Sequence, residues 1–168
     1  MTTQIDRRTF VISVAALAAA SGTAAFAQEA AETNMIEMLN QDPDNRRRRM
    51  VYKPLVTVVN AGDTVKWMPT DRGHNTVSIE GMLPEGAEEW KSKLNDEFEY
   101  TFAQPGVYGY LCQPHSSLGM VGLVIVRGEG MMDNVEAARA VKHRGRTAKV
   151  FEEIWALVDE ENLLEQSA

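Results

Sequence analysis

The sequence has one cysteine, Cys112, and only three histidines among its 168 residues. A single cysteine cannot form a disulfide within the chain, so the fold is not of the disulfide-stabilised kind. No apolar run reaches the roughly 20 residues that a membrane-spanning helix needs. Acidic residues outnumber basic ones by 24 to 17, giving a net charge of −7. This balance argues against a general nucleic-acid binder, because such proteins present a basic surface.

Residues 1–27 have the features of a cleaved signal peptide. Asp6-Arg7-Arg8-Thr9-Phe10-Val11 resembles a twin-arginine export motif, an apolar run follows, and Ala25-Phe26-Ala27 fits a cleavage site. An ordinary secretory signal with a chance arginine pair is the alternative, and the sequence leaves both routes open. Cleavage would leave residues 28–168 with a net charge of −8, because the signal carries one acidic and two basic residues. We expect this mature chain not to insert into a membrane.

Residues 34–127 have the pattern of short strands separated by turns. Phe98–Phe102 alternates aromatic and polar residues, which is the period-two pattern of a half-buried strand. Asn60-Ala61-Gly62-Asp63 and Gln104-Pro105-Gly106 are turn sequences, and Val121–Val126 predicts another strand. Several short strands with regular turns predict an all-β fold, a β-sandwich.

The pattern becomes helical from about residue 133. One helix is predicted over residues 134–142, and a second begins near Thr147. The second has apolar residues at three- and four-residue spacing, namely Val150, Phe151, Ile154, Trp155, Leu157 and Val158. Two short helices cannot bury a core of their own. We therefore expect them to pack on the sandwich within a single domain, residues 28–168.

The segment Cys112-Gln113-Pro114-His115-Ser116-Ser117-Leu118-Gly119-Met120 has a thiol, an imidazole and a thioether in one loop between two predicted strands. A second imidazole, His74, lies earlier in Gly73-His74-Asn75. Two histidines and one cysteine with a weak axial methionine form the ligand set of blue-copper electron-transfer sites. We therefore predict one type 1 copper ion, alternating between Cu(I) and Cu(II), with His74, Cys112, His115 and Met120 as its ligands.

Each of these residues has another interpretation when taken alone. A single methionine is usually a core residue, a single cysteine can simply be buried, and His74 could be a surface histidine. Their combination favours copper over structural zinc, because a thioether is a poor zinc ligand. His143, between Lys142 and Arg144, is interpreted as a solvated surface residue.

Gly73-His74-Asn75 and the spacing from Cys112 to Met120 resemble the cupredoxin family and, within it, the pseudoazurin group. The resemblance spans roughly residues 34–149, including Met38-Leu39-Asn40. It implies an eight-stranded Greek-key β-sandwich followed by two C-terminal α-helices, with the same four copper ligands. It also implies that Asn75 joins the His74 segment to the Cys112 loop.

The resemblance further implies a one-electron carrier in the periplasm, not an enzyme, and a monomer. Its partner would be a periplasmic redox enzyme with an acidic docking face, such as nitrite reductase or another denitrification enzyme. His115 would meet this partner through an apolar patch, whose candidates are Leu118, Pro114, Met50, Leu83 and Pro84. The candidates for a basic docking ring are Arg46, Arg47, Arg48, Arg49, Lys53, Arg72, Lys91 and Lys93.

Two other functions stay open. A copper storage or delivery protein without redox turnover would need methionine- or histidine-rich motifs, whereas the nine methionines here are scattered. A copper enzyme would need an open coordination position or a second metal. Four predicted ligands leave no open position, and His143 is the one remaining histidine.

Overall fold

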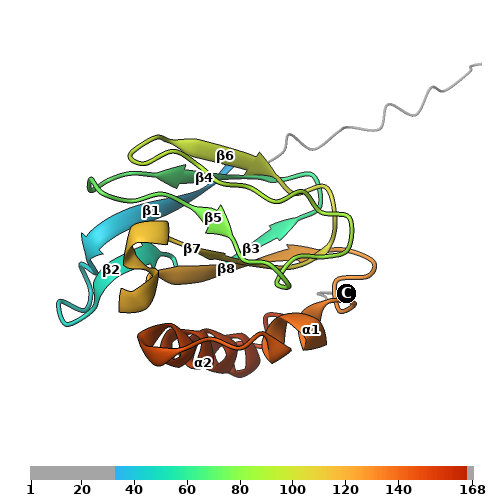
Figure 1. Cartoon of the computed structure of the whole chain (residues 1–168). Helices are drawn as coiled ribbons and strands as arrows, with labels where there is room; N and C mark the ends of the chain where they lie inside the picture. Colours follow the sequence, from blue (N-terminus) through green and yellow to red (C-terminus); the bar gives the residue numbers. More distant parts are fainter. Residues whose placement is uncertain (1–32, 166–168) are drawn as a thin grey trace, which may run out of the picture.

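The computed structural model describes residues 33–165, so the predicted signal peptide lies outside the described residues. Eight strands form two four-stranded sheets, followed by two helices (Figure 1). The sheet of order β2-β1-β4-β6 comprises β1 (Thr33–Gln41), β2 (Arg49–Lys53), β4 (Thr64–Met68) and β6 (Phe98–Thr101). The sheet of order β3-β8-β7-β5 comprises β3 (Val56–Asn60), β5 (Val77–Ser78), β7 (Gly106–Leu111) and β8 (Val121–Arg127). The 3-10 helix η1 (Gln113–Leu118) joins β7 to β8, and the last elements are α1 (Val135–Ala140) and α2 (Gly145–Glu160).

The core between the two sheets is rich in aromatic side chains. Trp67 on β4 is fully buried, and its ring centroid lies 5.3 Å from that of Tyr110 and 5.6 Å from that of Trp90. Burial alternates along β4, where Val65 and Trp67 point inward, as a strand with one solvent-facing side requires. These large rings fix the separation of the sheets, and with it the relative positions of the loops at either end.

The sheet β3-β8-β7-β5 is covered on both of its faces. Val124 and Val126 belong to the core between the sheets, whereas Leu123 and Ile125 pack in a second apolar cluster with Ile154 of α2. Both helices lie against this sheet, on the side away from β1, β4 and β6 (Figure 1). Double coverage explains why β8 is continuously apolar instead of alternating.

The predicted all-β Greek-key sandwich with two C-terminal helices is confirmed. The predicted turn at Asn60–Asp63 is present, closed by a hydrogen bond from Asp63 N–H to the carbonyl oxygen of Asn60. Within residues 33–165, no helix is long and apolar enough to cross a membrane.

Candidate metal centre

Two connecting segments at one end of the sandwich bring three of the predicted ligands together, the β4–β5 segment and the β7–β8 loop. His74 lies in the segment between β4 and β5, Cys112 directly follows β7, and His115 lies on η1. Cys112 N–H donates to the carbonyl oxygen of Met120 at 2.9 Å, so the antiparallel pairing of β7 and β8 continues to the base of the loop. The loop is therefore short and closed by its own strands, which limits the positions its side chains can adopt.

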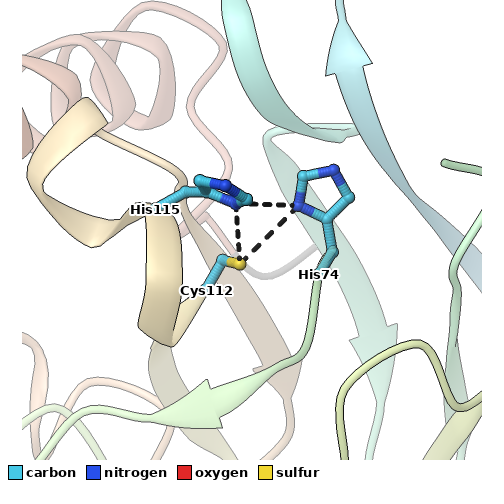
Figure 2. A group of neighbouring side chains, drawn as sticks. All are labelled: His74, Cys112 and His115. Atoms are coloured by element: carbon cyan, nitrogen blue, oxygen red, sulfur yellow. Dashed lines mark hydrogen bonds between the residues drawn. The ribbon is translucent and has the colours of Figure 1, made fainter. Parts of the chain in front are cut away.

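Figure 2 shows the side chains of His74, Cys112 and His115 pointing toward one another. Cys112 Sγ lies 3.7 Å from His74 Nδ1 and 3.6 Å from His115 Nδ1, and the two Nδ1 atoms are 3.1 Å apart. Cys112 and His74 are fully buried, and His115 is half-buried. Among residues 33–165, this is the one group of three or more histidine, cysteine or carboxylate side chains arranged to hold a metal ion.

The geometry of these three atoms fits a transition metal. The centre of a triangle with these sides is about 2 Å from each corner, close to the roughly 2.0–2.3 Å of a metal bond to histidine nitrogen or cysteine sulfur. The second ring nitrogen of His74, Nε2, lies 3.0 Å from the Asn40 side-chain oxygen. Because that oxygen only accepts hydrogen bonds, Nε2 carries the proton and Nδ1 presents a lone pair to the centre.

Protonation of the site follows from burial. Burial lowers the pKa of His74, and the neighbouring His115 lowers it further, so His74 is neutral at pH 7. Burial raises the pKa of the Cys112 thiol above its ordinary value of 9.0, and the backbone N–H groups of Asn75 and His115 offset part of that rise. The metal-free centre therefore holds its proton on sulfur, whereas the form that binds a metal is the thiolate.

This assignment predicts proton release when the metal-free protein takes up copper. Near pH 8 the Cys112 thiol is protonated, so we expect about one proton to leave per copper bound. The number should fall toward zero as the pH rises above the raised pKa of the thiol. Calorimetry in buffers of different ionisation enthalpy measures the count, and a count near zero at pH 8 would contradict the assignment.

Met120, the fourth predicted ligand, is fully buried in the core cluster that contains Cys112. Its backbone N–H donates to the carbonyl oxygen of His115 at 3.3 Å, and Gly119 before it has a φ of +82°. This left-handed residue ends η1 and turns the chain into β8, a conformation that favours glycine. Met120 thus belongs to the same short loop as Cys112 and His115.

Asn75 was expected to join the His74 segment to the Cys112 loop, and this is confirmed. Its side-chain oxygen accepts the Gln113 N–H at 2.9 Å, and its side-chain NH₂ donates to the carbonyl oxygen of Ser92 at 3.3 Å. The Tyr52 hydroxyl donates to the Asn75 carbonyl oxygen at 2.6 Å. Both sides of the centre are therefore fixed by one buried side chain.

Asn40 contacts the centre, although the sequence did not single it out. Its N–H donates to a carboxylate oxygen of Asp71 at 2.7 Å, while its side chain contacts His74 Nε2. Asp71 N–H in turn donates to the carbonyl oxygen of Met38. The tripeptide Met38-Leu39-Asn40 was visible in the sequence, but its role depends on the parallel pairing of β1 with β4, which no local pattern reveals.

We expect Asn40→Ala to weaken copper binding about 10- to 100-fold, because residues that orient metal-ligating histidines commonly contribute that much. Affinity would be measured by competition with a chelator of known strength. Asn34→Ala, a change of the same kind earlier on β1, is the control and should leave affinity unchanged. Equal affinities for the two variants would exclude a role for Asn40 at the centre.

Two expectations about surrounding residues are wrong, one about Leu83 and Pro84 and one about His143. Leu83 and Pro84 do not flank His115: they line a cavity of about 510 Å³ with Gln104 and Pro105 near the start of β7, whereas Cys112 follows its end. Their place beside the loop is taken by Leu94, which is 51% exposed and lines a groove with Pro114.

His143 is not a solvated residue either. Its ring stacks on Phe151 with centroids 4.1 Å apart, and burial lowers its pKa. The position is on the loop between α1 and α2, and the metal-binding cluster does not include it. His143 therefore contributes to the packing of α2.

Comparisons with known proteins agree with the geometry in indicating a metal-binding protein. Residues 37–127 match the family model of copper binding proteins of the plastocyanin/azurin family. The pseudoazurin of Methylorubrum extorquens is 38% identical over 148 residues, covering 88% of this chain and 95% of its own. The pseudoazurin of Paracoccus pantotrophus is 40% identical over 127 residues, covering 76% of this chain and 84% of its own. The crystal structure of pseudoazurin from Methylobacterium extorquens AM1 superposes with a TM-score of 0.70 at 38% identity, covering 76% of this chain and 99% of that one.

The chain belongs to the pseudoazurins. Copper is therefore the metal of this centre, and the two imidazoles and the thiol are arranged as a possible site for it. Structural zinc, the competing interpretation of the donor set, is set aside.

Proposed function

We propose that this pseudoazurin is a one-electron carrier and not an enzyme, with His74, Cys112, His115 and Met120 as its copper ligands. The observation that carries the proposal is the convergence of two Nδ1 atoms and one Sγ atom at 3.1–3.7 Å in a largely buried site. Copper, when bound, supplies a reversible one-electron couple between Cu(II) and Cu(I). The donor set mixes nitrogen, which suits Cu(II), with soft sulfur, which suits Cu(I).

The protein's part is to hold these donors still in both oxidation states. Asn40 fixes the ring of His74, and Asn75 fixes the backbone of Gln113 beside Cys112. The Cys112 side is closed by the backbone hydrogen bond to Met120. A donor set that hardly moves between oxidation states costs little to reorganise, and so supports fast electron transfer.

His115 is the proposed exit for the electron, because it is the one half-buried member of the three-residue cluster. Exposed apolar side chains lie at this end of the sandwich, near His115. Leu118 is 48% exposed, Leu94 is 51% exposed, and Pro114 is also exposed. A small apolar contact of this kind suits the brief encounters of redox partners, which bury little area.

Charge around the exit favours an acidic partner. Arg48 and Lys53 of the predicted docking ring are neutralised locally, by Glu153 and by Asp42 and Asp44 respectively. The other six ring candidates form no ion pair among the described residues, namely Arg46, Arg47, Arg49, Arg72, Lys91 and Lys93. Lys91 and Lys93 line the groove beside Pro114. We propose that these free cations steer an acidic redox enzyme onto the exit.

The partner that suits these features is a nitrite reductase or a related denitrification enzyme, met in the periplasm by a monomeric carrier after removal of residues 1–27. The family assignment and the export motif of the sequence support this part of the proposal. A copper storage or delivery protein is the alternative, and it differs in having no redox turnover.

The test of the function is an absorption spectrum of the copper-loaded, oxidised protein before and after adding a reductant. We expect an intense blue colour from a thiolate bound to Cu(II), which reductant bleaches and reoxidation restores. A loaded protein that is colourless, or whose colour does not respond to reductant, would remove the carrier proposal. Storage or delivery would then be the better account.

A further inference from the structure

The first turns of α2 contact the loop that carries His115 and Met120. The Thr147 hydroxyl donates to the carbonyl oxygen of Ser116 at 2.5 Å, across 31 residues of sequence. The same carbonyl accepts the N–H of Gly119 at 2.8 Å. In Figure 1, α2 extends beneath the end of the sandwich where η1 lies. One hydroxyl thus binds the stretch between the two proposed ligands.

Packing restricts the same stretch. A Cβ added to Gly119 would lie 2.8 Å from Val150 Cγ2 and 3.0 Å from Arg146 Cγ, closer than side chains normally approach. The space left among Leu118, Gly119, Arg146 and Val150 is only about 10 Å³, which is at the lower limit for a single water molecule. Gly119 therefore packs directly against the first two turns of α2.

The hydroxyl of Thr147 is not used for capping its own helix. Thr147 is the third residue of α2, where a threonine can serve local backbone groups, yet its hydrogen bond goes to η1. The residue before the helix, Arg144, makes no side-chain capping bond either. The Thr147 hydrogen bond therefore restrains the metal loop and does not cap the N-terminus of α2.

We propose that the start of α2 is a positioning element for the metal loop, with Thr147 holding the Ser116 carbonyl and so fixing Met120 relative to His115. The inference rests on the proposed ligand roles of those two residues. The loop's own bonds are of the 3-10 type, whose geometry is poorer than that of an α-helix. An anchor from outside the loop makes up for that weakness.

The decisive variant is Thr147→Val, which keeps the shape of the side chain and removes its donor. In the metal-free protein we expect the Gly119 and Met120 amides to exchange hydrogen about two- to tenfold faster, the range that one neutral hydrogen bond supplies. Thr147→Ser keeps the hydroxyl and should restore slow exchange. In the copper-loaded protein, Thr147→Val should alter the relative intensities of the visible bands, and Thr147→Ser should restore them.

Thr101→Val is the matched control, because its hydroxyl is bonded to that of Thr64, and both residues belong to the sheet β2-β1-β4-β6, which does not carry the metal loop. It should leave both the exchange of Gly119 and Met120 and the spectrum unchanged. Exchange in Thr147→Val equal to the parent, or Thr147→Ser as fast as Thr147→Val, would overturn the inference. Because exchange is measured without metal, it decides the role of α2 even if the parent protein proves not to be blue, which would instead remove the carrier function.

Discussion

Cys112→Ser is expected to abolish the blue colour of the copper-loaded protein and its reversible one-electron reduction. The substitution replaces the soft thiolate by a hydroxyl of nearly the same size, so the site keeps its shape and loses the donor that suits Cu(I). Absorption spectroscopy and voltammetry of the loaded variant measure both losses. Circular dichroism should be unchanged, because a hydroxyl of nearly the same size can keep the contacts that the Cys112 sulfur makes with the two imidazoles and with the backbone N–H groups of Asn75 and His115.

The control for this prediction is His143→Gln, which removes the one histidine outside the centre. It should keep the full colour, since His143 stacks on Phe151 and does not belong to the metal cluster. A Cys112→Ser protein that is still blue after loading would show that the thiol is not a ligand. Loss of colour in both variants would point instead to a general loss of structure.

Lys93→Glu is expected to slow electron transfer to an acidic reductase about tenfold at low ionic strength. Lys93 is exposed on the groove beside Pro114 and has no ion-pair partner among the described residues, so its charge acts outward. Steering by such charges accelerates encounter by about 10- to 1,000-fold in total, and a single reversal removes part of it. Stopped-flow kinetics with the reductase at increasing salt would measure the effect.

Lys142→Glu makes the same change of charge on the segment between α1 and α2, outside the predicted docking ring, and should have a much smaller effect. The rates of all three proteins should converge as salt rises, because screening at high ionic strength removes the advantage of the parent. A parent rate that does not depend on salt would contradict electrostatic docking. Equal slowing by both reversals would assign the effect to net charge alone.

Much of the fold was predictable because its signals are local. Period-two alternation marked Phe98–Phe102, turn residues marked Asn60–Asp63, and three- and four-residue spacing marked α2. The approach of Cys112 and His115 was predictable for the same reason: they are close in sequence, and β7 and β8 form an antiparallel pair on either side of them. The prediction that His74 joins the β7–β8 loop required only that another histidine occur near a strand end.

The parts that could not be predicted depend on contacts between distant segments. Asn40 reaches His74 because β1 pairs in parallel with β4. Leu94 borders the loop, and Leu83 does not, because of the path the chain takes between β5 and β6. The pairing of Arg48 with Glu153 joins the residue before β2 to α2 across 105 residues. No periodicity in the sequence encodes any of these neighbours.

The burial of Cys112 has a consequence for the assembly of the copper protein. Its side chain is fully buried and its pKa is raised, so in the folded, metal-free chain the sulfur is both shielded and protonated. Such a thiol reacts slowly with peroxide and alkylating reagents, which attack exposed thiolates. The apoprotein can thus persist undamaged before it acquires its metal. Folding first and metal loading second is then a workable order of maturation.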